Sequence, residues 1–323
     1  MRRVFYTGPA ADPADSVAVQ TVAPPVCPPG GVVVAVAVRP INPADLLLLT
    51  GRHVFVPALP APVGIEGVGT VVEAGPQSQL RVGELVAIPA GGTWAERLAL
   101  ADDAVLRLPP SVDLEQASML CVNPFTAVGL LEGLEPGSTV ALNAGTAAVS
   151  QLVLSIAKHR GLQAIAVVRD LRAAPALMAR GAAAVVEDGP DLAARLRAAA
   201  GAPIRRALDA VAGVASARLF HAVADGGELI VYGLLAADHV ELPAAELVFR
   251  DVTVRGYSRL RCYAAMAPER RRAIVDELVG LVARGEVHTD VEARYPLEQV
   301  REAVAHHNRP GRRGKVLLVS PGP

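Results

Sequence analysis

Residues 138–150 have the composition of a site for nucleotide phosphates. The apolar run 139–143 leads into small residues, and a helical pattern begins at Ser150. A strand, a tight turn and a helix in this order place a diphosphate against the backbone N–H groups that start the helix. Because Gly145 is the only glycine, the G-x-G-x-x-G pattern is incomplete, and a plain βα turn remains an alternative. The candidate cofactor-binding residues here are Asn143, Gly145, Thr146, Ala147, Ala148 and Val149.

Arg169 and Asp170, which follow the next apolar run, bear on the choice of cofactor. An acidic residue at this place binds the ribose hydroxyls of NAD, whereas an arginine pairs with the 2′-phosphate of NADP. Arg169 therefore favours NADPH over NADH. In the alternative, Arg169 only ends the strand and Asp170 holds the ribose.

The elements that must position these residues alternate between strand and helix from residue 112 to residue 262. We expect strands at 139–143, 164–168, 183–187, 206–211, 228–232 and 252–256, and helices that include 150–160 and 192–200. Continuous apolar strands separated by helices are typical of a parallel sheet covered on both faces. The expected fold class is α/β, with a doubly wound parallel sheet.

The first part of the chain is β-rich instead. Apolar runs at 32–38, 67–74 and 85–88 are each bounded by glycine or proline. After Pro268, a helix at 270–284 leads to a strand at 315–319 that we expect to rejoin this first domain. The predicted domains are therefore 1–111 with 263–323, which is β-rich, and 112–262, which binds the dinucleotide.

Composition excludes several classes of protein. The 323 residues are 52% hydrophobic and 20% charged, which indicates a chain with a core and not a disordered one. Its apolar runs are too short to span a membrane, and its start lacks the apolar stretch of a signal peptide, so we expect a cytoplasmic protein. A net charge of −1 predicts no attraction to nucleic acid or to membranes. Three scattered cysteines predict neither a disulfide framework nor a structural zinc site.

Several motifs occur in an order that resembles the medium-chain dehydrogenase/reductase superfamily. The resemblance spans nearly the whole chain, and within the superfamily the sequence is most similar to the 2-enoyl thioester reductases. It implies a Rossmann domain and a β-rich GroES-like catalytic domain. The motifs are Asn42-Pro-Ala-Asp45, Gly64-Ile-Glu-Gly67, Gly92-Thr-Trp94, Val122-Asn-Pro-Phe-Thr-Ala127, the turn at 143–150, Val168-Arg-Asp170, Tyr232-Gly233 and Gly314-Lys-Val-Leu-Leu318.

The resemblance also indicates that no metal takes part. Zinc-dependent members hold the metal with a cysteine, a histidine and a second cysteine. Asn42, Ile65 and Val122 occupy the matching positions here, and Cys121 is one step away. Without zinc to polarise an alcohol or aldehyde, the enzyme is better suited to reducing an activated carbon–carbon double bond.

A tyrosine donates the proton in the family, and this chain departs from that pattern. The matching segment is Gly51-Arg52-His53. Histidine can donate a proton near neutral pH, so His53 is the candidate catalytic residue, and a plain surface histidine is the alternative.

The resemblance implies further site residues. Asn42, Trp94 and Tyr257 are candidates for substrate binding, although Trp94 fits a core aromatic equally well. The other residues that the resemblance places at the cofactor are Asn123, Thr126, Tyr232, Gly233, Leu234, Leu235, Ser258, Arg259 and Lys315.

These features together predict an NADPH-dependent reductase of a 2-enoyl thioester. A quinone or enone reductase of the same superfamily is the alternative within enzymes, and a non-catalytic NADPH-binding sensor is the alternative from another class. The substrate carrier is coenzyme A or an acyl carrier protein, and the family implies a homodimer. A solvated face or a site for the phosphates of that carrier would explain the arginines at 259, 261, 270, 271, 272, 312 and 313.

Overall fold

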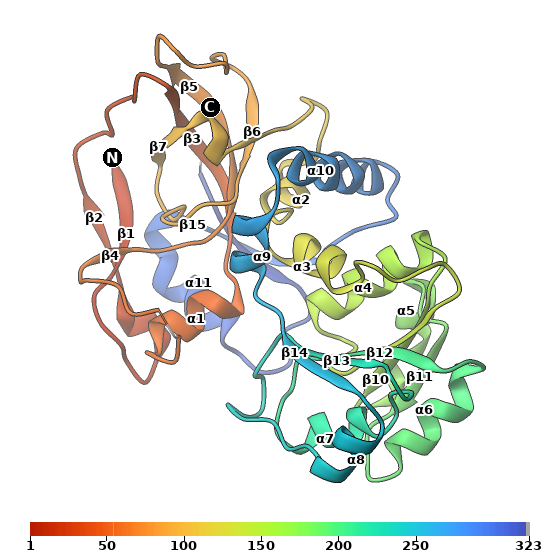
Figure 1. Ribbon diagram of the computed structural model, residues 1–323. Coiled ribbons are helices and arrows are strands. Elements are labelled where there is room, and N and C mark those ends of the chain that lie inside the picture. Colours follow the sequence, from red (N-terminus) through yellow and green to blue (C-terminus); the bar gives the residue numbers. More distant parts are fainter. Residues whose placement is uncertain (54, 321–323) are drawn as a thin grey trace. The chain divides into compact units, whose positions relative to one another are not determined.

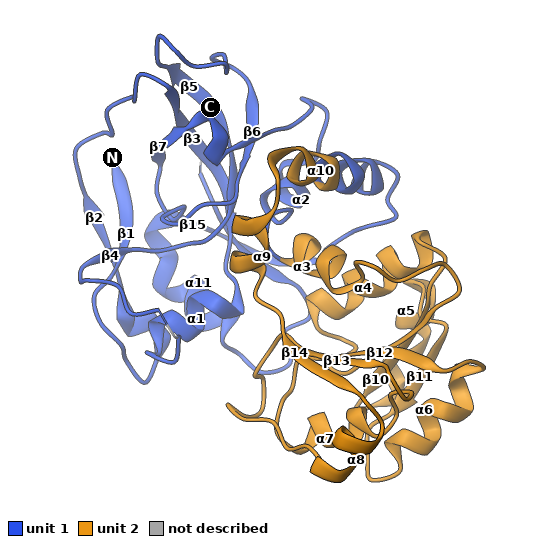
Figure 2. Ribbon diagram, viewed as in Figure 1, with its two compact units in different colours: residues 1–122, 275–323 blue, residues 123–274 orange. Residues whose placement is uncertain are grey.

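The computed structural model describes residues 1–53 and 55–320. It divides into two compact units, residues 1–122 with 275–323 and residues 123–274 (Figure 2). The expected domain boundaries were placed at 111/112 and 262/263. Within the described residues, no helix is both long and apolar enough to cross a membrane.

The second unit contains a six-stranded, all-parallel sheet with the order β11-β10-β9-β12-β13-β14 (Figure 1). The strands are β9 (Thr139–Leu142), β10 (Gln163–Val168), β11 (Ala184–Glu187), β12 (Ile204–Asp209), β13 (Glu228–Val231) and β14 (Thr253–Gly256). Strand order reverses between β9 and β12, and in such sheets ligands bind at the carboxyl ends of the strands beside this reversal. The predicted doubly wound sheet is confirmed.

Helices cover both faces of this sheet (Figure 1). Helices α4 (Ala148–His159), α5 (Ala174–Ala179), α6 (Leu192–Ala200) and α7 (Val214–Phe220) contact its strands. The other helices of this unit are α3 (Asn123–Leu130), α8 (Ala244–Phe249) and α9 (Arg259–Ala265), and α10 (Pro268–Ala283) begins in it. Apolar residues of β9, β10 and β12 pack with α6 and α7 in one core, which includes Ile165, Leu196 and Phe220. The central strands β9 and β10 are buried on both sides, and apart from Thr139 and Gln163 their residues are apolar.

The first unit contains a seven-stranded sheet and a three-stranded one. The larger follows the path β15-β16-β3-β5-β6-β8, with β7 paired to β3, and the smaller has the order β2-β1-β4. The strands are β1 (Arg2–Tyr6), β2 (Val17–Thr21), β3 (Gly31–Pro40), β4 (Ala61–Pro62), β5 (Gly67–Ala74), β6 (Leu85–Ile88), β7 (Arg97–Ala101), β8 (Leu106–Arg107), β15 (Val291–Pro296) and β16 (Lys315–Val319). The helices are α1 (Pro43–Leu49), α2 (Leu114–Ser118) and α11 (Val300–His307).

Strand β16 returns to the first unit as expected and pairs antiparallel with β3. Val316, Leu317 and Leu318 are fully buried there. The buried Arg39 of β3 donates hydrogen bonds to the Leu318 carbonyl (3.4 Å) and to Ser320 Oγ (2.8 Å). The last strand is therefore part of the core that the first hundred residues build.

Candidate cofactor and substrate site

The predicted phosphate turn lies at the carboxyl end of β9, beside the reversal of strand order. Helix α4 begins at Ala148, two residues before the helix start that we predict, so Ala148 and Val149 lie in its first turn. Ala147 at the N-cap offers no side chain to the N–H groups of that turn, and these groups have no partner within the helix. These N–H groups are therefore available to an anion, and the binding of a diphosphate there stays a prediction.

Gly145 is required by the packing of the turn against β10. A Cβ atom there would lie 3.0 Å from Val168 Cγ1 and 3.1 Å from Ala166 Cβ. The preceding residue, Ala144, adopts a left-handed conformation with φ of +48°. That conformation is uncommon for a residue with a side chain, so the surrounding structure must stabilise the turn.

Asp209 provides much of that stabilisation, and sequence reasoning missed it. Its buried carboxylate accepts hydrogen bonds from Asn143 Nδ2 (2.6 Å), from the N–H groups of Val211 (2.8 Å) and Ala212 (3.1 Å), and from Ser216 Oγ (2.5 Å). The Asn143 side-chain oxygen in turn accepts from the Ala210 N–H at 2.8 Å. Asn143 and Asp209 therefore join the ends of the two strands at the reversal.

The predicted bounds of the strand at 206–211 are wrong by two residues, because β12 runs from Ile204 to Asp209. The carboxylate of Asp209 bonds the N–H groups of the two residues that follow Ala210, and this ends the strand before Val211. An acidic residue directly after the apolar pair Ala207-Leu208 is the signal that would have identified this position.

Tyr232 supports the same turn from the end of β13. Its hydroxyl lies 3.3 Å from Ser150 Oγ, which also contacts the Asn143 carbonyl at 3.2 Å. Burial raises the pKa of Tyr232 to about 12, so the side chain stays a neutral phenol at physiological pH. The next residue, Gly233, has no room for a side chain, because a Cβ there would lie 2.6 Å from the Ala210 carbonyl oxygen. Leu234 and Leu235 are exposed beyond it, 38% and 61%, respectively.

Arg169 and Asp170 lie at the carboxyl end of β10, and both are exposed. Asp170 is engaged with its own chain: it accepts from the backbone N–H of Arg172 at 2.9 Å and from Arg172 Nε at 2.7 Å. These hydrogen bonds lower the pKa of Asp170. Over residues 1–53 and 55–320, Arg169 forms no ion pair. Of the two, Arg169 is the one whose charge is available to a ligand.

Helix α3 carries Asn123 and Thr126, which are 6% and 8% exposed. Tyr257, which follows β14, packs against this helix, since a Cβ at Gly129 would lie 2.1 Å from its hydroxyl. Burial raises the pKa of Tyr257. Its hydroxyl thus faces a helix, which does not favour the predicted substrate contact. Ser258 caps α9, its Oγ lying 3.5 Å from the Arg261 N–H.

The first unit holds a buried polar network around Asn42. Lys315 Nζ donates hydrogen bonds to Asn42 Oδ1 and to the Ile41 carbonyl, the latter at 3.3 Å. Asn42 Nδ2 donates to Glu66 Oε1 at 3.0 Å, and the other oxygen of Glu66 accepts from the Val122 N–H at 2.8 Å. Glu66 therefore joins two of the three positions at which relatives with zinc carry ligands.

This network changes the interpretation of two candidate residues. Lys315 is 2% exposed and its ammonium group bonds to Asn42. The cofactor contact that the resemblance implies for Lys315 stays a prediction. Asn42 is 1% exposed, with its amide held by Lys315 and Glu66. Both side chains serve the packing of the first unit. Within the described residues, no cluster of histidine, cysteine and acidic side chains is arranged to hold a metal.

Asp45 belongs to the same network and gives it a pH dependence. Its Oδ2 accepts from the Asn42 N–H at 2.8 Å, whereas its buried Oδ1 has no hydrogen-bond partner. Burial raises the pKa of Asp45 from 3.8 to about 7. A raised pKa means that the folded protein binds this proton more tightly than the unfolded chain does.

We therefore expect Asp45 to reduce stability progressively as the pH rises from about 4 to about 7. Asp45→Asn removes this ionisation, so its free energy of unfolding should rise relative to wild type between about pH 5 and about pH 8 in urea denaturation. Asp238→Asn, at an exposed position, is the control. If the free energy of unfolding of Asp45→Asn differed from that of wild type by the same amount at about pH 5 and at about pH 8, the expectation would be contradicted.

Trp94 and His53 differ in accessibility. Trp94 is fully buried in a core with Val4, Ile41 and Leu318, which favours the core alternative over substrate binding. His53 follows α1 and is half-buried, and its Nδ1 accepts a hydrogen bond from the Phe55 N–H at 3.0 Å. In this arrangement the ring proton lies on Nε2, which is the atom able to donate to a ligand.

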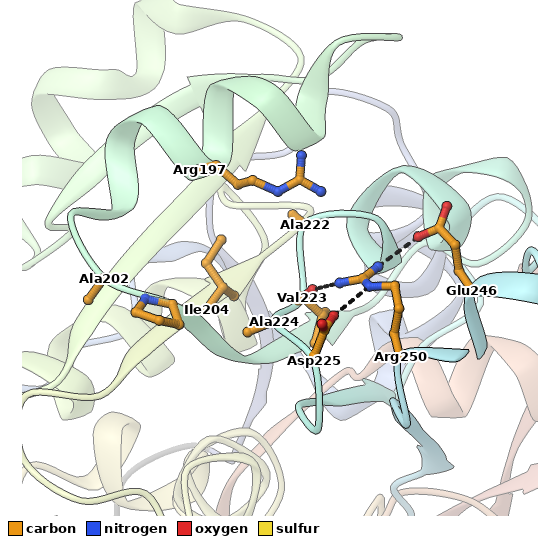
Figure 3. Close-up of a pocket in the computed structure, with 10 residues that line it drawn as sticks. Arg197, Ala202, Ile204, Ala222, Val223, Ala224, Asp225, Glu246 and Arg250 are labelled. Carbon is orange, nitrogen blue, oxygen red and sulfur yellow. Dashed lines mark hydrogen bonds and ion pairs between the residues drawn. The ribbon is translucent and has the colours of Figure 1, made fainter. Parts of the chain in front are cut away.

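A pocket of about 660 Å³ lies at the other end of the strands from the phosphate turn, near the amino ends of β12 and β13 (Figure 3). Arg250 donates to Asp225 (2.8 Å) and to Glu246 (2.7 Å) there. Arg250 is therefore neutralised by two carboxylates of the same pocket. The phosphate turn therefore remains the candidate site of the second unit.

Comparison with known proteins identifies the family of both units. Residues 28–110 match a family model described as "Alcohol dehydrogenase GroES-like domain", and residues 148–278 match one described as "Zinc-binding dehydrogenase". A mitochondrial enoyl-[acyl-carrier-protein] reductase of Homo sapiens is 30% identical over 331 residues, which cover 98% of this chain and 88% of the relative. The expected GroES-like first domain is confirmed.

Solved structures share the fold over nearly the whole chain. A putative NADPH:quinone reductase from Bacillus thuringiensis is 26% identical, with a TM-score of 0.88 over 99% of this chain and 100% of that one. A structure described as the Etr1p/NADP/crotonyl-CoA complex is 23% identical, with a TM-score of 0.86 over 99% of each chain. At that identity the second likeness supports the fold alone.

Proposed function

The chain belongs to the medium-chain dehydrogenase/reductase superfamily as an oxidoreductase related to the enoyl-acyl-carrier-protein reductases, and we propose that it reduces the double bond of a 2-enoyl thioester with NADPH. The observation that carries the proposal is 30% identity to an enoyl-[acyl-carrier-protein] reductase across 98% of the chain. We propose further that no metal takes part, because Asn42, Ile65 and Val122 include no thiolate or imidazole.

The residues of the turn fit a dinucleotide. A bound NADPH would supply a hydride for the β-carbon of the substrate. The first turn of α4 would bind its diphosphate through backbone N–H groups, and Gly145 lets the turn before it pack closely against β10. Arg169 would pair with the 2′-phosphate. In this proposal Asn123 and Thr126 of α3 lie along the nicotinamide end.

His53 is the proposed donor toward the substrate. As hydride reaches the β-carbon, negative charge develops on the thioester oxygen and the α-carbon needs a proton. With Nδ1 accepting from Phe55, His53 Nε2 carries the only ring proton and can hydrogen-bond the oxygen. The bond from the Phe55 N–H fixes this tautomer. To supply the proton itself, His53 must first be protonated on both nitrogens, because only the imidazolium form is an acid near neutral pH.

Substrate turnover tests the proposed function directly. We expect NADPH to be oxidised faster with crotonyl-CoA than with a small quinone. The likeness to a putative NADPH:quinone reductase makes quinone reduction the second candidate, and faster turnover of the quinone would favour it. Binding of NADPH without oxidation by any alkene or quinone would instead indicate a non-catalytic sensor.

The cofactor preference should depend on Arg169. A charge-assisted hydrogen bond to the 2′-phosphate contributes about 1.5 to 3 kcal/mol, or roughly ten- to a hundredfold in affinity. Arg169→Asp should therefore weaken NADPH binding by that factor and leave NADH binding nearly unchanged, as measured by fluorescence titration of both cofactors. Equal losses for the two cofactors, or a wild-type preference for NADH, would contradict the assignment.

We also propose that the protein is a homodimer. Strand β14 is the edge of the parallel sheet and is mostly exposed. Val248 and Phe249 of α8 are 72% and 86% exposed, and large exposed apolar side chains grouped together mark protein interfaces. Sedimentation velocity would show whether two copies associate.

A further inference from the structure

Two arginines share the ring of Tyr263 at the junction of α9 and α10. The guanidinium carbon of Arg271 lies 4.6 Å from the ring centroid, and that of Arg259 lies 6.0 Å from it. Tyr263 in turn meets the ring of Phe125 edge-on, with the centroids 5.5 Å apart. Because Phe125 belongs to α3, this contact fixes the arginine pair beside the helix that carries Asn123 and Thr126.

The charges of this pair are not neutralised within the described residues. Other arginines of the same segment have carboxylate partners: Arg255 bonds Glu228, and Arg270 bonds Glu132 at 2.9 Å. Arg259 and Arg271 form no ion pair in residues 1–53 and 55–320. Cation–π contacts orient these guanidinium groups but leave their mutual repulsion in place.

Burial also leaves N–H groups of the pair without acceptors. Arg259 Nη1 and Arg271 Nε are both buried, and neither has a hydrogen-bond partner. Arg271 Nη2 does bond the Ala264 carbonyl at 3.2 Å, which fixes the direction of that side chain. Two oriented and partly desolvated guanidinium groups that lack a carboxylate are the arrangement that binds a phosphate group.

We propose that Arg259 and Arg271, held by Tyr263, bind a phosphate group of the nucleotide part of a coenzyme A thioester. The proposal rests on the proposed function for the identity of the substrate. Both guanidinium groups lie beside a single ring, although they come from two helices, and this local concentration of positive charge favours a compact anion over an acidic protein. Substrate recognition would thus include the carrier, away from the reacting double bond.

Titration of adenosine 3′,5′-bisphosphate into the full chain tests the proposal, with saturating NADP⁺ present to occupy the cofactor site. Calorimetry should show saturable binding, and Arg259→Gln or Arg271→Gln should each raise the Kd about tenfold or more. The matched control is Arg261→Gln, which removes the same charge from α9. Its side chain is exposed and lies two residues from Tyr263, so it projects from another face of the helix.

Turnover separates this proposal from the proposed function. Arg271→Gln should raise KM for crotonyl-CoA with little change in kcat, and should leave both constants unchanged for the N-acetylcysteamine thioester, which has no phosphate. If neither thioester is reduced but bisphosphate binding still depends on Arg259 and Arg271, the proposed function fails and the phosphate site stands.

Three results would overturn the site. The first is a wild-type chain that does not bind the bisphosphate, and the second is a pair of glutamine variants that bind it as well as Arg261→Gln does. The third is an effect seen only with an acyl carrier protein, which would assign the arginines to an acidic protein surface. Arg271→Lys keeps the positive charge and serves as the conservative variant. Thermal melting of each variant shows that it is folded.

Discussion

Asp209→Ala should lower the free energy of unfolding by about 3 to 5 kcal/mol, because it leaves several buried donors without an acceptor. The donors are the Asn143 amide, the Ser216 hydroxyl and two backbone N–H groups, all within 3.1 Å of the carboxylate in the wild-type protein. Chemical denaturation followed by circular dichroism measures the loss. The variant should also bind NADPH more weakly, since Asn143 begins the phosphate turn.

Two variants make that measurement specific. Asp209→Asn keeps one oxygen acceptor and a similar shape, so it should lose less stability than Asp209→Ala. Asp238→Ala removes an acidic side chain that is 88% exposed, and it should change stability by no more than about 0.5 kcal/mol. If Asp209→Ala were as stable as Asp238→Ala, the carboxylate would not be holding the strand ends together.

His53→Ala should lower kcat for the best alkene substrate by about a hundredfold or more while leaving NADPH affinity nearly unchanged. A positioned general acid contributes roughly 100- to 10,000-fold in rate, and the lower figure applies if His53 only stabilises the oxygen. Steady-state kinetics with crotonyl-CoA and a parallel NADPH titration give both quantities. His239→Ala, at an exposed loop position, is the control.

Replacement by other donors distinguishes the two roles of His53. His53→Gln keeps an N–H group but cannot give up a proton, so it should retain activity only if the hydrogen bond to the oxygen is what matters. His53→Tyr recreates the residue of the family and should recover part of the rate lost in His53→Ala. A His53→Ala variant with wild-type kcat would show that the proton comes from water or from another side chain.

The sequence predicted those elements that are short, apolar and clearly bounded. The predicted bounds are correct for strands β5, β6 and β16 and for helix α6. Glycine or proline lies at or near the ends of each of these strands, and the helix ends before a glycine. Strand β15 was missed because Glu292 and Arg294 alternate with its less polar residues, and it is stabilised by pairing with β16 and by the packing of Ala293 and Tyr295 against a distant core. Local patterns do not report such tertiary pairing.

The candidate site was predictable in part for the same reason. The phosphate turn is a local feature of thirteen consecutive residues, 138–150, and could be found without a complete glycine pattern. The Asn143–Asp209 and Asn42–Glu66 contacts join segments far apart in the chain, 66 and 24 residues, so no local signal reveals them. The burial of Lys315 was unexpected because a lysine on an apolar strand normally extends its ammonium group to solvent.

The place of β16 in the first unit has a consequence for synthesis on the ribosome. The second unit is one continuous stretch, residues 123–274, and it can begin to fold while the rest of the chain is still being made. The first unit cannot be completed then, because residues 38–40 of β3 lack their partner strand until residues 315–319 emerge, although β5 and β7 can already pair with the rest of β3. Until that moment this end of β3 stays unpaired on one edge. Translation therefore finishes the later unit first, and the nascent amino-terminal segment is the part of the chain most in need of a chaperone.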